Sequence, residues 1–114
     1  MGFMHTIYTV LITAPVNESG KIARILVEER LAACVNIVPE IRSIYRWQGK
    51  IEEESESLLI VKTTAERMDE LKSRVLEIHP YNVPEIIALP VADGLEKYLN
   101  WVRDETSTED KQTE

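Results

Sequence analysis

Cysteine, glycine and recognisable catalytic pairs are scarce in this chain of 114 residues. The single cysteine, Cys34, cannot form an intramolecular disulfide, so we expect a small buried hydrophobe in a reducing compartment. Only four glycines are present, and none is spaced as in a phosphate-binding loop. No Ser-His-Asp or Cys-His pairing typical of a catalytic site is apparent within the sequence motifs described below. The sequence therefore predicts a protein that is not an enzyme.

Long apolar runs and rows of positive charge are also missing. No segment approaches the length of a membrane span and no signal peptide is recognisable, so we expect a cytoplasmic protein that does not contact membranes. Lysine and arginine number 13 against 20 acidic residues, a net charge of −7. No basic cluster could neutralise a row of phosphates, so nucleic-acid binding is not expected.

The acidic excess is greatest at the carboxyl end. Residues 104–114 hold five acids, one base and no apolar residue, which predicts a disordered acidic tail. The chain as a whole is 44% hydrophobic and 29% charged, enough for one core. We therefore expect a single domain over residues 1–103.

The most informative segment covers residues 43–54, where a Gln-Gly turn separates two long runs of strand-forming residues. Gly49 supplies the positive φ of a tight hairpin, and the arms cover residues 33–47 and 51–63. About thirteen paired residues would span ~43 Å, whereas a compact domain of this length is roughly 34 Å across. The hairpin should overhang and dock on a neighbouring copy. The alternative is a bend at Pro39 that shortens the first arm.

The rest of the sequence alternates strand and helix. Strand-like runs cover residues 6–13 and 86–91, and apolar residues at 3.6-residue spacing predict three helices. The resulting order is βαββαβ with an extra C-terminal helix. This order predicts a ferredoxin-like fold of the α+β class.

Local signals predict where the first two helices begin and end. Asn17 is the expected cap of the first helix, and Thr63 with Glu66 resembles a capping box for the second. The second helix should end at His79, because a residue before proline is disfavoured in helical conformation.

Three strands are apolar on both faces, in residues 8–12, 58–61 and 86–89. Right-handed crossovers place both main helices on one face of a four-stranded antiparallel sheet, so the other face also needs a cover. The third helix could cover part of that face. We expect the sheet of another copy to cover the rest.

Four segments of this chain closely resemble the divalent-cation tolerance (CutA) family. They read LVEERLAACVN at 26–36, SIYRWQGKIE at 43–52, HPYNVPEI at 79–86 and YLNWV at 98–102. The resemblance runs from about residue 6 to residue 102, with all four motifs in the family's order. It implies a ferredoxin-like protomer, a homotrimer whose long hairpins cross between subunits, a cytoplasmic location, and a role in tolerance of copper and other divalent metals.

The resemblance also implies copper ligands at three positions, and this chain keeps one of them. The positions align with Ile12, Ile78 and His79, of which only His79 can bind a metal. Copper and zinc sites use three or four imidazole or sulfur ligands, and Cys34, His5 and His79 show no paired spacing. Two interpretations of His79 stay open: a ligand that binds Cu²⁺ or another divalent cation weakly, or a helix-end residue hydrogen-bonded to a carbonyl.

A second set of residues suits a small molecule. Aromatic faces combined with one cation and one carboxylate are typical of ligand pockets, and the resemblance places several of them in clefts between subunits. Tyr45 and Trp47 have an alternative use as interface anchors. The acidic run at residues 52–56 is interpreted as a solvated edge. The candidate cleft residues are Tyr45, Trp47, Lys62, Tyr81, Glu85 and Trp101.

Two noncatalytic functions follow from these observations. The first is a homotrimeric protein of divalent-metal tolerance, with copper or another divalent cation as its partner. The second is a trimeric small-molecule sensor or interaction platform similar to the PII-type signal proteins, an analogy of fold that carries little functional weight.

Overall fold

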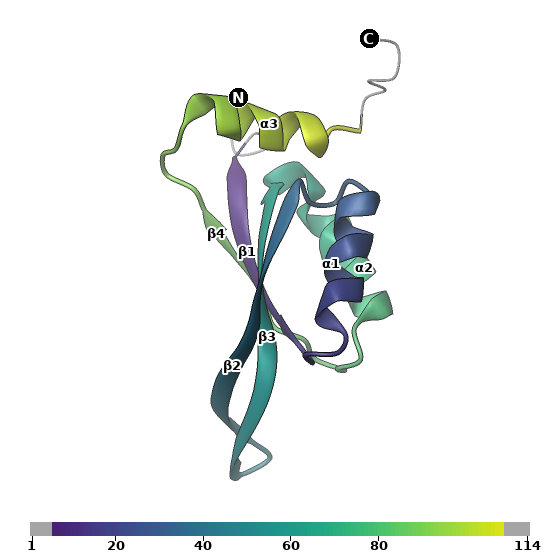
Figure 1. The fold of residues 1–114 in the computed structure, drawn as a ribbon, viewed down its shortest axis with the longest axis vertical. Coiled ribbons are helices and arrows are strands. Elements are labelled where there is room, and N and C mark those ends of the chain that lie inside the picture. Colours follow the sequence, from purple (N-terminus) through teal and green to yellow (C-terminus); the bar gives the residue numbers. More distant parts are fainter. Residues whose placement is uncertain (1–5, 109–114) are drawn as a thin grey trace.

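The computed structural model describes residues 6–108 as one α+β unit (Figure 1). The element order confirms the expected ferredoxin-like βαββαβ arrangement with a C-terminal helix. The elements are β1 (Ile7–Ala14), α1 (Ser19–Glu28), β2 (Cys34–Trp47), β3 (Lys50–Thr64), a short 3-10 helix (Ala65–Arg67), α2 (Met68–Ile78), β4 (Ile86–Pro90) and α3 (Glu96–Glu105).

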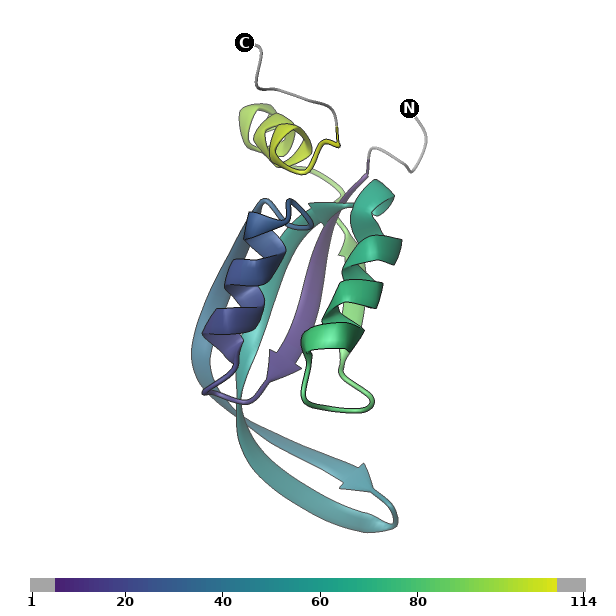
Figure 2. The same cartoon turned by 90° about the vertical axis from the view of Figure 1, so that its right-hand side faces the viewer.

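The four strands form one antiparallel sheet in the order β2-β3-β1-β4. Helices α1 and α2 lie side by side on one face of this sheet, as Figure 2 shows, and α3 lies across one end of it. The core fills the space between the sheet and the two helices. Its fully buried side chains include Val10, Ile12, Ile22, Leu26, Leu59, Val61, Leu71 and Val75.

The hairpin of β2 and β3 overhangs the body of the molecule, as its length predicted (Figures 1 and 2). Its turn residues Gln48 and Gly49 have φ values of 50° and 80°, the positive pair that a tight two-residue hairpin turn requires. The molecule measures 52 × 27 × 22 Å, and its radius of gyration is 15.1 Å. A compact domain of this length would have a radius of about 13 Å. The radius of gyration is larger than this value because the hairpin protrudes from the body of the molecule.

Proline 39 marks a bulge in β2 and not the end of its arm. The pairing with β3 shifts register between Val38 and Ile41, so the strand bends there and then continues to Trp47. The hydroxyl of Ser57 on β3 donates a 2.8 Å hydrogen bond to the Pro39 carbonyl oxygen. The bend at Pro39 therefore exists, but it does not remove the overhang.

Both predicted helix starts are wrong. Helix α1 begins at Ser19, whose hydroxyl donates to the carbonyl oxygen of Val16, and no side chain caps the helix at Glu18. Thr63 lies within β3, and its hydroxyl donates a 2.7 Å bond to the Leu31 carbonyl oxygen. Long-range pairing with the rest of the sheet thus overrides the local capping pattern. The predicted end of α2 at His79 is confirmed.

The sheet face opposite the helices carries exposed apolar side chains. Strand alternation turns Leu11 and Ile60 away from the core, and Ile87 and Leu89 on the same face are each 49% exposed. Helix α3 covers only the end of this face, where Val102 is buried. Among residues 6–108, no helix is long and apolar enough to cross a membrane.

The boundary expected between the folded domain and the acidic tail, at residue 103, lies too close to the N-terminus. Helix α3 continues through Glu105, and Thr106 is 2% exposed, with its hydroxyl donating to the Val102 carbonyl oxygen. The folded part therefore extends at least three residues beyond the expected boundary at 103. Residues 109–114 of the predicted tail lie outside the described residues.

Replacing Gly49 tests the hairpin turn. We expect Gly49→Ala to lower the free energy of unfolding by about 1 kcal/mol, because an L side chain is disfavoured at φ 80°. Gly20→Ala is the control, since Gly20 lies in α1 and no atom lies within 4 Å of the position of an added Cβ. It should be neutral or stabilising by up to about 1 kcal/mol. A Gly49→Ala protein as stable as the wild type in urea unfolding would contradict the turn assignment.

Candidate functional site

A groove lies between the overhanging hairpin and the loop that follows α2. Its volume is about 770 Å³. Strands β2 and β3 supply one wall, and the loop between α2 and β4 supplies the other. The lining residues are Thr13, Ser43, Ile44, Tyr45, Trp47, Glu52, Glu54, Glu56, Tyr81, Asn82, Val83 and Glu85.

Acidic side chains reach this groove because side chains alternate along β3. Glu52, Glu54 and Glu56 share one face of the strand and line the groove. Glu53 points to the other face, where it pairs with Arg42. The run is therefore not simply the solvated edge that its composition suggested. Three of its five residues line the groove.

One of these carboxylates is buried at the root of the hairpin. Glu56 is only 6% exposed, and its Oε1 accepts a 3.0 Å hydrogen bond from the hydroxyl of Tyr81. Burial, followed by the bond to Glu56, raises the pKa of Tyr81 well above its usual range. At Tyr45, a hydrogen bond to Glu54 is the main cause of a raised pKa. The carboxylates of Glu54 and Glu56 thus contribute to both shifts, although burial is the larger cause at Tyr81.

His79 lies behind the groove wall with both ring nitrogens engaged. It is 7% exposed, and Nδ1 accepts a 3.1 Å bond from the backbone N–H of Tyr81. Nε2 therefore carries the proton and donates a 2.8 Å bond to the Thr13 carbonyl oxygen at the end of β1. The ring also stacks at an angle on Tyr81, with centroids 4.7 Å apart. This geometry favours the interpretation of His79 as a structural helix-end residue.

The metal interpretation of His79 gains no support from its surroundings. A ligating imidazole needs a free nitrogen lone pair, and here both nitrogens bind the main chain. Ile12 and Ile78, at the other two aligned positions, offer no donor atoms. Within residues 6–108, no group of three His, Cys, Asp or Glu side chains could hold a metal ion. His5 lies outside the described residues.

The structure brings four of the six predicted cleft residues together. Tyr45, Trp47, Tyr81 and Glu85 all line the groove. Lys62 does not: it lies on the open sheet face, where its ammonium group donates to the side-chain oxygen of Asn36.

Trp101 also lies away from the groove. It sits on α3 beside Tyr98, with ring centroids 5.5 Å apart, and is 41% exposed. A cleft that used Lys62 and Trp101 together with the groove would need a second copy of the chain.

Sequence reasoning missed part of the groove wall. The carboxylates of Glu52, Glu54 and Glu56 and the side chain of Thr13 line it, and none was a candidate. Alternation along β3 could have shown that the three glutamates share a face. Only the three-dimensional path of the loop after α2 shows that this face is covered.

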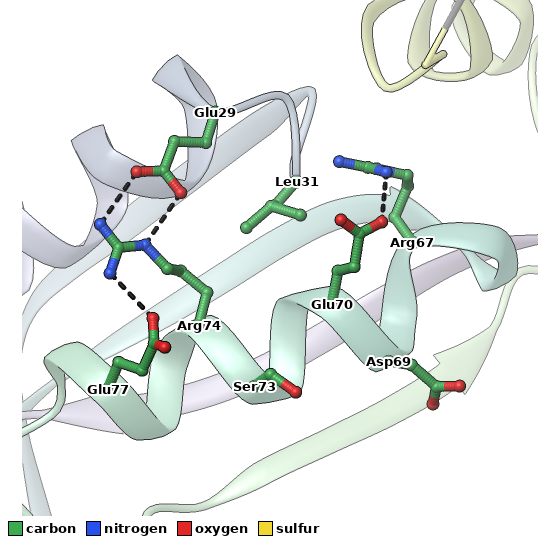
Figure 3. A pocket seen from close by; sticks show the side chains of 8 residues that line it. All are labelled: Glu29, Leu31, Arg67, Asp69, Glu70, Ser73, Arg74 and Glu77. Carbon is green, nitrogen blue, oxygen red and sulfur yellow. Dashed lines mark hydrogen bonds and ion pairs between the residues drawn. The ribbon is translucent and has the colours of Figure 1, made fainter.

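A second cavity, of about 390 Å³, lies between the end of α1 and α2 (Figure 3). Arg74 donates 2.9 Å bonds to both oxygens of Glu29 and a 3.0 Å bond to Glu77. Arg67, 7% exposed, pairs with Glu70. Each arginine is thus already neutralised by carboxylates. The bonds of Arg74 to Glu29 and Glu77 connect the end of α1 to α2, so we interpret these side chains as structural and the cavity as no ligand site.

Comparison with known proteins gives a consistent family match. The family described as CutA1 divalent ion tolerance protein matches residues 8–105. The divalent-cation tolerance protein CutA of Thermus thermophilus is 59% identical over 98 residues, which cover 85% of this chain and 95% of that protein. Protein CutA of Homo sapiens is 48% identical over 104 residues, covering 90% of this chain but 58% of the human protein.

The solved structures agree with the sequence match. The structure of the divalent cation tolerance protein from Thermus thermophilus superposes with a TM-score of 0.86 at 57% identity. The superposition covers 89% of this chain and 99% of that chain. The fold of this chain is therefore the fold of that structure.

Removing the His79 ring separates its structural role from metal binding. We expect His79→Ala to leave the affinity for Cu(II) and Zn(II) unchanged in isothermal titration. The free energy of unfolding should fall by about 1–3 kcal/mol, because the Thr13 carbonyl loses a buried donor. His79→Gln, which keeps a donor, should recover part of this loss. Stoichiometric metal binding that disappears in His79→Ala would contradict this account.

The Tyr81–Glu56 hydrogen bond predicts a loss of stability at high pH. The raised pKa of Tyr81 means that the fold holds the phenol proton more tightly than the unfolded chain, where the pKa is about 10. The stabilisation is complete below about pH 10 and falls as the pH rises further. Urea midpoints measured between about pH 9 and 11 should decline less steeply in Tyr81→Phe. Identical slopes in both proteins would exclude this contribution.

Proposed function

Because this chain belongs to the CutA1 divalent ion tolerance family, we propose that it acts in divalent-cation tolerance as a homotrimer. The observation that carries the proposal is the incomplete surface of the single chain. Its hairpin protrudes, and the sheet face opposite α1 and α2 is apolar and largely uncovered. The subunit number of three comes from the resemblance to the family.

Exposed apolar groups on the hairpin support the same proposal. Ile44 and Ile51 are each 62% exposed and Trp47 is 51% exposed, although they belong to a two-stranded ribbon with no third strand beside it. Such a ribbon is marginally stable in water by itself. Contact with another copy would bury these side chains and complete the ribbon.

Metal binding in this proposal is weak and uses oxygen ligands. His79 has no free nitrogen, whereas the groove holds four carboxylates that accept divalent cations at their oxygen atoms. Copper and other divalent cations would then bind with the affinity of ordinary carboxylates. Titration of the assembled protein with Cu(II), Zn(II) and Mg(II) tests this part, and tight binding of one metal alone would contradict it.

One observation favours a second function, that of a small-molecule sensor. The groove combines the aromatic side chains of Tyr45, Trp47 and Tyr81 with convergent polar groups, as ligand pockets do. Native mass spectrometry of protein taken directly from cells would test this function. If the protein is a small-molecule sensor, the spectra should show a small molecule that stays bound to the protein.

A lysine on the open face tests the homotrimer. Leu89→Lys places a charge among the apolar side chains that a second copy would cover, so we expect the assembly to dissociate in sedimentation velocity. Leu76→Lys is the matched control, because Leu76 is 57% exposed on α2 at the opposite face of the sheet. It should sediment like the wild type. If Leu89→Lys also sediments like the wild type, the open face is not the interface.

A further inference from the structure

We propose that His79 is a pH-sensitive latch: a proton on its Nδ1 releases the backbone of Tyr81 and thereby loosens the root of the hairpin. The inference goes beyond divalent-cation tolerance and beyond the small-molecule function, and it requires neither a metal nor a ligand. The latch consists of His79, Tyr81 and Glu56, which connect the end of α2 to β3. Every contact that it uses lies within one chain.

The two ring nitrogens of His79 have opposite roles, which makes the ring sensitive to a single proton. The backbone N–H of Tyr81 can only donate, so Nδ1 must present its lone pair to this group, at 3.1 Å. The Thr13 carbonyl oxygen can only accept, so Nε2 must carry a proton, at 2.8 Å. An imidazolium carries protons on both nitrogens and cannot keep both bonds.

The surroundings of the ring do not compensate for a lost bond. His79 is 7% exposed, so little water can solvate a charged ring. Among residues 6–108, no carboxylate forms a hydrogen bond or an ion pair with this ring. On α2, Glu77 pairs with Arg74, and β1 presents the Thr13 carbonyl oxygen, which Nε2 already occupies. A second ring proton therefore costs the bond to Tyr81.

The titratable groups of the hairpin act on Tyr81. Burial, followed by Glu56, Glu54 and Tyr45, raises the pKa of the Tyr81 phenol above its usual range. The phenol therefore keeps its proton in mild acid and can still donate to Glu56. A protonated Glu56 carboxyl group also keeps an oxygen that accepts this bond. Within the latch, only protonation of His79 removes a hydrogen-bond acceptor.

Tyr81 transmits the change from His79 to the hairpin. Its ring packs at an angle on the imidazole, with centroids 4.7 Å apart, and its hydroxyl donates a 3.0 Å bond to Oε1 of Glu56. Glu56 directly precedes Ser57, where the pairing of β3 with β1 ends, and before that point β3 pairs only with β2. A movement of Tyr81 therefore reaches the residue at which the hairpin leaves the sheet.

The direction of the pH dependence follows from the neutral ring. The charge of histidine side chains changes between about pH 5 and 8. The bond from the Tyr81 N–H requires the neutral ring, so its contribution is complete at the upper end of this range and is lost as the pH falls. The latch is thus closed in neutral solution and opens in mild acid.

Nuclear magnetic resonance of the wild-type assembly tests the proton and the bond together. Imidazole nitrogen shifts should show the Nε2–H tautomer of His79 at about pH 8 and the doubly protonated ring at about pH 5.5. The protection factor of the Tyr81 amide, which corrects hydrogen exchange for its intrinsic pH dependence, should fall about tenfold because one hydrogen bond is lost. A ring that stays neutral, or a Tyr81 amide protected equally at both pH values, would overturn the proposal.

A histidine-to-glutamine variant separates the latch from other effects of acid. The side chain of His79→Gln does not titrate, and its amide offers a donor and an acceptor to the same main-chain groups. Protection of residues 81–83 should then be the same at both pH values. His5→Gln, which replaces the other histidine of the chain, is the control and should keep the wild-type response. A wild-type response in His79→Gln would place the cause elsewhere and overturn the proposal. If this variant does not fold, the wild-type titration still decides.

Tyr81→Phe separates the latch from its transmission to the hairpin. The variant keeps the backbone N–H that binds His79 and lacks the hydroxyl that binds Glu56. The amide at position 81 should therefore keep its pH response, whereas hydrogen exchange at residues 54–57 of β3 should depend on pH only in the wild type. A response of β3 that is equal in both proteins, or absent from both, would overturn the coupling of the latch to the hairpin.

Discussion

The pairing of β2 with β3 is the constraint on which the rest of the structure depends. These strands have 14 and 15 residues, whereas β1 and β4 have 8 and 5. The register of β1 on β3 ends where Ala14 faces Ser57, so β3 before that point has only β2 beside it. The overhang, the groove and the exposed apolar ribbon all follow from this difference in length.

The root of the hairpin links the sheet to the loop after α2. The bulge at Pro39 bends β2, and Ser57 bonds its carbonyl oxygen. One residue earlier, Glu56 accepts the bond from Tyr81, whose backbone N–H binds the His79 ring. This chain of hydrogen bonds fixes the hairpin over the loop. The groove is therefore a product of the fold, and its shape depends on a few buried polar groups.

The sequence predicted what depends on local chemistry and periodicity. The Gln48-Gly49 turn and the end of α2 before Pro80 follow from backbone preferences, and the order of strand and helix patterns predicted the topology. The prediction failed at residues whose conformation is determined by contacts with distant parts of the chain. Thr63 was read as a cap, but it completes β3 and bonds Leu31, which is 32 residues away. For the same reason, burial of Glu56 under Tyr81 could not be read from an acidic run.

The central claim is that one chain is structurally incomplete and that its copies cover the open sheet face and the hairpin. Sedimentation velocity of the wild-type protein, diluted to micromolar concentration, tests it most directly. The account predicts a single species of three times the 13.1 kDa chain mass. A stable species of one chain mass, with its hairpin and open face exposed to water, would contradict it.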